Sequence, residues 1–147
     1  MTASSSASQR ARVRMKPKSN ARAIRHGFPW VYANELVTDR RTKGLTPGAL
    51  AVLEDDKRQA MGIVAANSQS RIFCRMLERD TEVVIDQTWF EAKFARALAM
   101  RQRLYATPFY RLIHAEADGL PGVVVDRFGD TAVVQPNAAW ADVLLEP

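Results

Sequence analysis

The chain has 147 residues, of which 47% are hydrophobic and 25% charged, with one cysteine and a formal net charge of +5. This length holds one ordinary domain or two small ones, and the composition excludes a wholly disordered chain because it supplies a core. A single cysteine excludes an internal disulfide, and no apolar run approaches the roughly 20 residues that cross a bilayer. The first eight residues lack a secretory signal, so we expect a cytoplasmic protein.

Positive charge is concentrated in the first third of the chain. Residues 1–43 hold ten basic and two acidic side chains, whereas the rest hold eleven basic and fourteen acidic ones. Focused positive potential is typical of a polyanion partner, and phosphate contacts supply most of the affinity for nucleic acids. The sequence therefore favours nucleic-acid binding over a merely solubilising basic surface or a disordered basic arm.

The first half predicts a small barrel after a disordered tail over residues 1–9. Alternating basic and apolar residues predict a strand over 12–16, and Pro17 ends it. Ser19 or Asn20 can cap a short helix that runs to about His26. Three more strands are expected, over 49–53, 59–66 and 71–77. Short strands at this spacing predict a β-barrel domain over residues 10–78.

The second half predicts a smaller domain over residues 79–137. A strand is expected at 82–85, and Thr88 with Glu91 matches a capping box at the start of an amphipathic helix that Pro108 ends. Three further strands are expected, over 110–115, 123–126 and 131–135. The predicted class is α+β, a small barrel followed by a strand-helix-strand domain, and residues 138–147 would begin a following domain.

Three aromatic residues stand close together after the predicted first helix. Phe28, Trp30 and Tyr32 alternate along the chain, so a strand would place their rings on one face. Such a trio more often belongs to a core, and we favour that interpretation. The alternative is that exposed rings stack on unpaired bases.

Two stretches of the chain resemble a known family. Residues 110–130, YRLIHAEADGLPGVVVDRFGD, look like the linker-domain signature of the RlmI-type ribosomal RNA methyltransferases. Residues 25–32, RHGFPWVY, resemble the helix-to-strand passage of that family's amino-terminal PUA domain, and residues 61–63 and 68–72 fit its later strands. The resemblance covers about residues 12–137 and implies a PUA barrel followed by a β-β-α-β-β-like linker domain.

The resemblance also implies a function. These enzymes use S-adenosylmethionine to make 5-methylcytosine in large-subunit ribosomal RNA, and a following Rossmann-like domain performs the chemistry. This chain shows no strand with the glycine-rich turn and acidic residue that seat such a cofactor, so we expect none here and no catalysis by the chain alone. Cys74 shares a strand face with Ile72 and Met76, which predicts a core thiol rather than a nucleophile.

The candidate site is an interface for ribosomal RNA. It comprises the basic residues Lys16, Lys18, Arg22 and Arg25, together with His26 and Trp30. Guanidinium groups can hold phosphates bidentately, and the resemblance favours this surface over a solvated cationic face. Lys93, Arg96 and Arg103 on the later helix could extend the interface, although a solvated helix face is the commoner explanation.

Two rival hypotheses remain. His114, Glu116 and Asp118 alternate, and a strand would aim all three at one metal or substrate, as in a small stand-alone enzyme. Their spacing matches no strong metal signature, so we expect no metal. A protein-interaction module would instead self-associate through apolar surface near Trp140, Val143 and Leu144.

Overall fold

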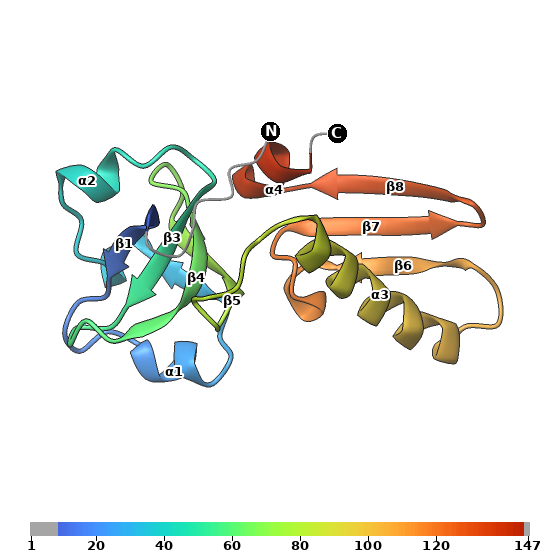
Figure 1. Ribbon diagram of the computed structural model, residues 1–147, viewed down its shortest axis with the longest axis horizontal. Coiled ribbons are helices and arrows are strands. Elements are labelled where there is room, and N and C mark those ends of the chain that lie inside the picture. The colour runs from blue at the N-terminus through green and yellow to red at the C-terminus, as the bar shows by residue number, and fades with distance from the viewer. Residues whose placement is uncertain (1–8, 146–147) are drawn as a thin grey trace. The chain divides into compact units, whose positions relative to one another are not determined.

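The computed structural model describes residues 9–145, so nearly all of the tail predicted at residues 1–9 lies outside the described residues. The chain divides into two compact units, an N-terminal unit up to Val83 and a C-terminal unit from Val84 (Figure 1). None of the described helices has the length and apolar character needed to cross a membrane.

The N-terminal unit is built on a five-stranded sheet in the order β1-β3-β4-β5-β2. Its strands are β1 (Ala11–Arg14), β2 (Trp30–Tyr32), β3 (Ala49–Glu54), β4 (Ala60–Ala66) and β5 (Ile72–Glu78). β1 runs parallel to β3, and all other neighbours are antiparallel. The expected β3, β4 and β5 strands are confirmed to within about a residue, because each is a short, largely apolar run that is bounded by turn residues.

Short helices connect the early strands of this unit. They are α1 (Ala21–Arg25), the 3-10 turn η2 (Ala33–Glu35) and α2 (Arg40–Lys43). The sheet curls, but its edge strands β1 and β2 do not pair with each other, so the barrel is not fully closed. An isolated bridge joins Met15, just after β1, to Leu36, a few residues after β2. The α+β class is confirmed, and closure of the sheet is limited to this bridge.

One hydrophobic core fills the N-terminal unit. Alternate residues of β1 point inward, so Val13 and Met15 are fully buried beside Leu53 of β3. Val31 of β2 and Cys74 of β5 are paired across their strands in the same cluster. The core thus fixes β1 and β2, the two strands that flank the basic segment.

The C-terminal unit is a three-stranded antiparallel sheet, β6-β7-β8, with a long helix. Its elements are α3 (Gln87–Leu104), β6 (Phe109–His114), the 3-10 turn η3 (Ala115–Asp118), β7 (Val123–Phe128), β8 (Thr131–Pro136) and α4 (Ala139–Leu144). Helix α3 packs against β6 (Figure 1). The order is therefore α-β-β-β rather than the β-β-α-β-β arrangement that the resemblance implied.

The strand expected at residues 82–85 is absent because its backbone is used in a turn. Asp80 accepts a hydrogen bond from the Glu82 amide at 2.9 Å. The guanidinium of Arg10 donates to the carbonyl oxygens of Thr81 and Val83, both at 2.9 Å. A side chain thereby satisfies carbonyls that a neighbouring strand would otherwise bind.

Helix α3 begins two residues earlier than predicted. Its N-cap is Asp86, whose carboxylate accepts a hydrogen bond from the Trp89 amide at 3.0 Å. The capping box predicted for Thr88 and Glu91 is therefore wrong. Aspartate and threonine are both good N-caps, and the sequence offered both within three residues.

Trp140 of α4 belongs to the core of the C-terminal unit. Its side chain is 1% exposed, and its indole Nε1 donates to the carbonyl oxygen of Pro121 at 2.9 Å. The ring stacks on Phe90 of α3 at a centroid distance of 5.9 Å. The prediction that Trp140 contributes to an exposed apolar surface is wrong, because the short segment after β8 folds back as a helix onto this cluster.

Candidate nucleic-acid interface

The segment between β1 and β2 carries the five predicted basic residues on its surface. Lys16 and Lys18 lie in the turn after β1, Arg22 and Arg25 on α1, and His26 at the C-cap of that helix. All five side chains are exposed. Lys18 has a positive φ of 63°, and the neighbouring Ser19 hydroxyl donates to the Lys16 carbonyl oxygen at 2.6 Å. These contacts define the turn that presents the two lysines.

Helix α1 is held against the sheet by one apolar residue. Ile24 is 1% exposed and belongs to the core, so Arg22 and Arg25 face away from it. Gly27 follows with a φ of 114°, a conformation that favours glycine, and the Phe28 amide donates to the Ala23 carbonyl oxygen at 3.0 Å. The sequence thus turns sharply from a cationic helix into β2.

The basic side chains differ in how far the protein already uses them. Arg25 forms an ion pair with the buried carboxylate of Asp55, and Lys16 Nζ donates to the Asn34 carbonyl oxygen at 3.1 Å. Lys18, Arg22 and His26 have no side-chain partner among residues 9–145. Arg25 stays 46% exposed, so part of its five-donor guanidinium still faces solvent. The cationic groups of Lys18 and Arg22 and the ring of His26 are therefore available to a ligand.

Aromatic rings lie next to this basic segment. The side chains of Phe28 and Tyr32 are exposed, at 39% and 38%. Val31, which lies between them in the sequence, is the residue of β2 that enters the core. The core interpretation of the aromatic residues is wrong for Phe28 and Tyr32. In a strand of only three residues, a single inward position suffices, and the valine occupies it.

Trp30 is half-buried and makes two ring contacts. Its ring lies edge-on to Phe28 at a centroid distance of 6.2 Å. The guanidinium of Arg75 on β5 lies over it at 5.8 Å, since the two residues are paired across the strands. Arg75 was not predicted as a site residue, because only the strand pairing reveals its position. The three side chains form an aromatic and cationic patch.

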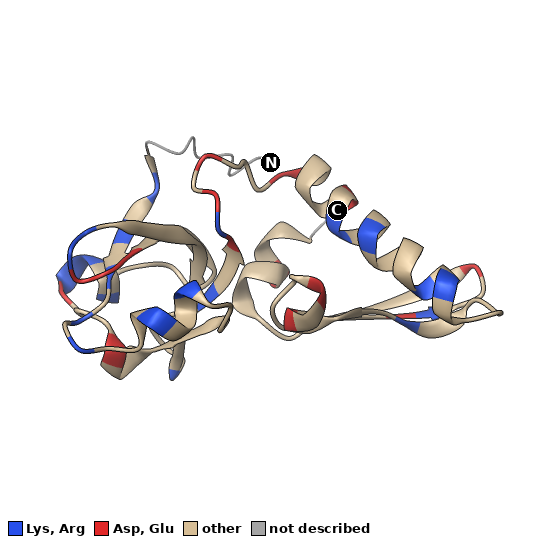
Figure 2. Cartoon of the chain, turned by 90° about the horizontal axis from the view of Figure 1, so that it is seen from below, with Lys and Arg blue, Asp and Glu red and all other residues tan. Residues whose placement is uncertain are grey.

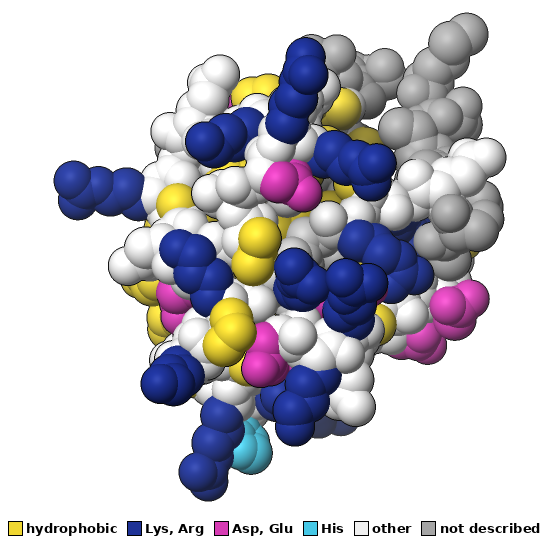
Figure 3. All heavy atoms as spheres, turned by 90° about the vertical axis from the view of Figure 1, so that its left-hand side faces the viewer, with side chains coloured by type: hydrophobic (Ala, Val, Ile, Leu, Met, Phe, Trp, Pro, Cys, Tyr) yellow, Lys and Arg dark blue, Asp and Glu magenta, His cyan; other side chains and the backbone are white. Residues whose placement is uncertain are grey.

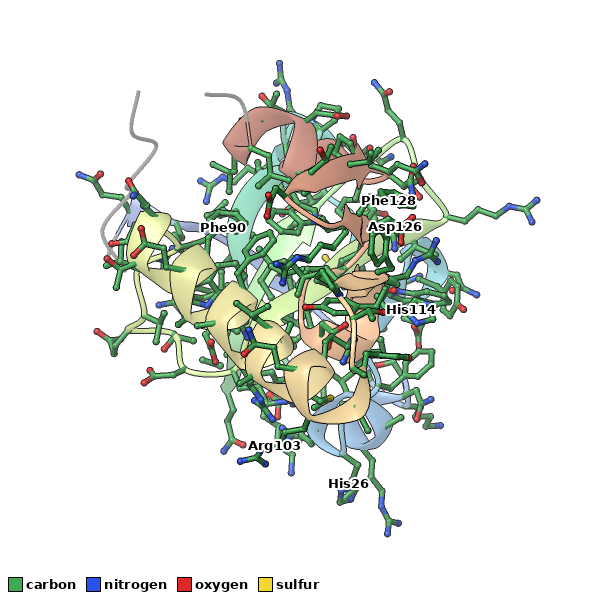
Figure 4. All side chains as sticks on the ribbon, turned by 90° about the vertical axis from the view of Figure 1, so that its right-hand side faces the viewer. His26, Phe90, Arg103, His114, Asp126 and Phe128 are labelled. Carbon is green, nitrogen blue, oxygen red and sulfur yellow. The ribbon has the colours of Figure 1, made fainter. Side chains whose placement is uncertain are left out.

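Positive side chains dominate one face of the N-terminal unit. Figure 3 shows this face covered by Lys and Arg with only a few Asp and Glu between them. Figure 2 shows basic positions along the backbone of this unit and also along α3. On α3, Arg96 and Arg103 are exposed (Figure 4 labels Arg103). Lys93 is half-buried, and its ammonium lies 5.0 Å from the Trp89 ring centroid. Only two of the three side chains are freely exposed, so we interpret α3 as a solvated helix face and leave it outside the candidate interface.

His114, Glu116 and Asp118 do not lie on one strand face, as the predicted site would have required. β6 ends at His114, and the following 3-10 turn begins at Ala115 with a φ of 47°. Asp118 Oδ2 accepts hydrogen bonds from the His114 amide and from Arg101 Nη2, both at 2.7 Å. No three potential metal ligands come together within the described part of the chain. The alternation that suggested a shared face fails because the strand ends after the first residue.

The described residues do not fit a nucleoside cofactor. Between residues 9 and 145, no strand leads through a glycine-containing turn into a helix, which is the arrangement that holds a dinucleotide or nucleoside phosphate. Cys74 is fully buried, and burial raises the pKa of its thiol to about 12. A thiol in this state is a poor nucleophile at neutral pH.

Comparison with known proteins identifies the class. The family model of the PUA-like domain matches residues 13–79. A ribosomal RNA large subunit methyltransferase of Deinococcus radiodurans is 34% identical over 95% of this chain and 36% of its own length. Ribosomal RNA large subunit methyltransferase I of Shewanella denitrificans is 33% identical over 92% of this chain and 35% of its own length.

A solved structure shows the same fold. A proposed SAM-dependent methyltransferase from Streptococcus mutans superposes with a TM-score of 0.73 at 15% identity, over 90% of this chain and 34% of that one. A further solved chain, a proposed methyltransferase in complex with SAH, matches with the same score and coverage. The chain contains a PUA-like domain over residues 13–79, and along most of its length it is similar to ribosomal RNA large subunit methyltransferases. It spans about a third of the length of the relatives that it matches.

Proposed function

We propose that the N-terminal unit binds structured RNA, specifically ribosomal RNA, through the basic segment between β1 and β2. The observation that carries the proposal is the set of exposed side chains Lys18, Arg22 and His26, which have no partner within the described residues. Contacts between cationic side chains and phosphates release counterions from RNA, and this release favours binding. Lys18 and Arg22 can make such contacts without first breaking an ion pair within the protein.

The aromatic patch supplies a second kind of contact. Ribosomal RNA exposes unpaired bases in loops and bulges, and such bases stack on aromatic rings or guanidinium planes. Phe28, Trp30 and Arg75 offer both kinds of surface beside the basic segment. The proposed interface therefore combines backbone contacts from α1 and its preceding turn with stacking on the outer face of β2.

Within the complete methyltransferase, this unit would position ribosomal RNA for methyl transfer. The described residues offer no cofactor cradle and no reactive cysteine, so S-adenosylmethionine and the chemistry belong in this proposal to another part of such an enzyme. The relatives' names support ribosomal RNA as the partner, and a cytoplasmic location follows from that partner.

A salt titration tests the proposal. Binding of the 147-residue chain to a fragment of large-subunit ribosomal RNA would be measured at several salt concentrations. The affinity is expected to fall steeply with salt, and Lys18→Ala with Arg22→Ala should lower the slope of log K against log salt by about 1.4–1.8. The matched control is Arg103→Ala, an exposed cation on α3, which should leave the slope almost unchanged.

Three results would count against RNA binding by this segment. They are an undetectable affinity, an affinity that ignores salt, or an equal loss in the double variant and the Arg103→Ala control. Circular dichroism of each variant separates a lost contact from a lost fold, and exposed side chains of this kind are expected to change stability little.

A second candidate, a protein-interaction module, is favoured by exposed apolar residues of the C-terminal sheet. Phe109 and Phe128 are cross-strand partners on β6 and β7 and are 63% and 54% exposed (Figure 4 labels Phe128). Val133 and Val134 of β8 are about half exposed as well. Sedimentation velocity decides between the candidates, since self-association that persists without RNA affinity would support this one.

A further inference from the structure

A basic hollow lies beside β1, away from the segment that the proposed function uses. It encloses about 260 Å³. Its lining residues are Arg12, Arg14, Val37, Asp39, Thr42, Glu54 and Arg58. Three of these seven residues are arginines, and none of the three was predicted as a site residue.

Strand geometry and one turn bring the arginines together. Arg12 and Arg14 alternate with the buried Val13 and Met15, so both project from the outer face of β1. Their separation along the strand is about 6.6 Å. Arg58 comes from the turn between β3 and β4, where its amide donates to the Asp55 carbonyl oxygen at 3.1 Å.

The three arginines and two carboxylates of the hollow give it a formal net charge of +1, and two of the arginines have no side-chain partner among residues 9–145. Arg12 is paired with the buried carboxylate of Glu54. Asp39 caps α2 and accepts hydrogen bonds from the Arg41 and Thr42 amides at 2.9 Å, and these bonds hold the pKa of its carboxyl below the usual value. The carboxylates of Glu54 and Asp39 thus both have hydrogen-bond partners within the protein. Arg14 and Arg58 have no side-chain partner in the described part of the unit.

We propose that this hollow binds a phosphate group, and that in the RNA complex a backbone phosphate of the bound strand fills it. The proposal rests on the proposed function and adds a second contact surface to it. A guanidinium fork matches phosphate oxygens bidentately, and Arg14 and Arg58 supply two such forks from different elements. The ligand chemistry is a phosphate oxyanion, whether in a phosphodiester or as free phosphate.

The lining selects a phosphate over a base. Val37 is the only apolar side chain among the seven, and no aromatic ring contributes, so the hollow has no surface on which a base could stack. A second hollow of about 360 Å³ adjoins it and shares Arg12, Asp39 and Thr42. Arg10 and Arg41 line that second hollow. Arg10 is buried and already donates to the Thr81 and Val83 carbonyl oxygens, so the cations that border the outer side of β1 are Arg12, Arg14 and Arg41.

Phosphate binding can be measured directly on the full chain. In ¹⁵N NMR spectra, the Nε–Hε signals of Arg14 and Arg58 are expected to shift saturably with inorganic phosphate at low salt, and those of Arg103 are not. Adding an RNA hairpin with an unpaired loop should shift the same two signals and displace phosphate. Arg14→Gln with Arg58→Gln should lower the slope of log K against log salt for RNA by about 1.4–1.8. Arg103→Gln is the matched control.

The outcomes separate this inference from the proposed function. If the Arg14 and Arg58 signals do not respond to phosphate, the hollow does not bind phosphate and this inference is wrong. That holds even if the double variant Lys18→Ala with Arg22→Ala still weakens RNA binding. A phosphate response with an unchanged RNA slope shows that the hollow takes free phosphate and overturns its role in RNA binding. If both double variants bind RNA as tightly as the wild type, both proposals are wrong.

Discussion

The carboxylate of Asp55 forms an ion pair with the guanidinium of Arg25, thirty residues earlier in the chain. The other carboxylate oxygen accepts hydrogen bonds from the amides of Lys57 and Gln59, at 2.9 and 2.8 Å. One buried aspartate therefore fixes both the β3–β4 turn, which carries Arg58, and the helix α1, which carries Arg22. The two proposed contact surfaces share this structural support.

Removing the charge at Asp55 should weaken the N-terminal unit in a pH-dependent way. The Gln59 amide, with Arg25 and the Lys57 amide, holds the pKa of the Asp55 carboxyl below its ordinary value of 3.8, against the opposing effect of burial. Its stabilising contribution is complete above the unfolded-state pKa and is lost as the pH falls through the lower folded-state pKa. Asp55→Asn should lower the thermal midpoint by several degrees at pH 7, and the gap from the wild type should narrow towards pH 3.

The exposed neighbour provides the control for that prediction. Asp56→Asn changes the same charge in the same turn, but the Asp56 side chain makes no hydrogen bond or ion pair within residues 9–145, so the variant should have little effect on the midpoint. Equal effects of the two variants at pH 7, or a gap that widens on acidification, would contradict the role of Asp55. Differential scanning calorimetry at both pH values makes the comparison.

Cys74 should be unreactive until the protein unfolds. Burial raises the pKa of its thiol to about 12, so only about one thiol in ten thousand is ionised at pH 8, and the sulfur is fully enclosed. Labelling by a disulfide reagent should be slow in buffer and fast in concentrated urea. Cys74→Ser should destabilise the fold by about 1–3 kcal/mol, because it buries a hydroxyl group without an evident partner. Rapid labelling of the native protein would contradict this assignment.

Gly62 is a position where the fold demands glycine. Its φ is 152°, and an added Cβ would lie 2.5 Å from the Glu78 carbonyl oxygen and 2.7 Å from Met76 Sδ. Gly62→Ala should therefore cost about 1–3 kcal/mol of stability through strain and overpacking of β4 against β5. Gly44→Ala is the control, since Gly44 has a helical φ of −85° and the nearest contact of its added Cβ is 3.3 Å. Urea unfolding of both variants measures the difference.

The sequence predicted what local patterns determine. The strands β3 to β5 were predicted because each is a short apolar run between turn residues, and α3 was predicted because its apolar residues follow a helical period. Residues 82–85 looked like a strand, yet the side chain of Arg10, some seventy residues away, takes their carbonyl groups. No local pattern contains that information.

The candidate site was likewise predictable only where local sequence determines it. The exposure of the basic residues around α1 was predictable, because one short helix cannot bury so many charges. The pairing of Arg25 with Asp55 and the position of Arg75 over Trp30 depend on contacts between distant strands. The aromatic trio was misassigned because alternation shows which residues share a face, but not which face the core occupies.

Trp140 should be essential to the C-terminal unit. It is almost fully buried, stacks on Phe90 and donates to the Pro121 carbonyl oxygen. Trp140→Ala should cost about 3–5 kcal/mol by leaving a cavity, and Trp140→Phe about 1–3 kcal/mol, chiefly through the lost hydrogen bond. Val143→Ala, at a position that is 58% exposed on the same helix, should be nearly neutral. Similar costs for Trp140→Ala and Val143→Ala would show that α4 does not pack as described.

Loss of a stacking contact and loss of a phosphate contact should change RNA binding differently. The first should lower the affinity only, whereas the second should also lower the salt dependence of the affinity. Phe28→Ala removes an exposed ring that contacts Trp30 edge-on, without changing any charge. If an unpaired base stacks there, the affinity should fall by about 5- to 150-fold, the equivalent of about 1–3 kcal/mol per base, while the salt slope stays that of the wild type. Fluorescence anisotropy with a loop-containing RNA measures both quantities.

Phe109→Ala is the matched control for the stacking prediction, because Phe109 is an exposed ring of the C-terminal unit. It should leave RNA affinity unchanged if the bases stack only on the rings beside α1. Replacing the loop by a fully paired stem should also remove the effect of Phe28→Ala, since a paired base is not free to stack on a protein ring. A loss that is equally large for the paired stem would mean that Phe28 supports the position of α1 rather than contacting a base.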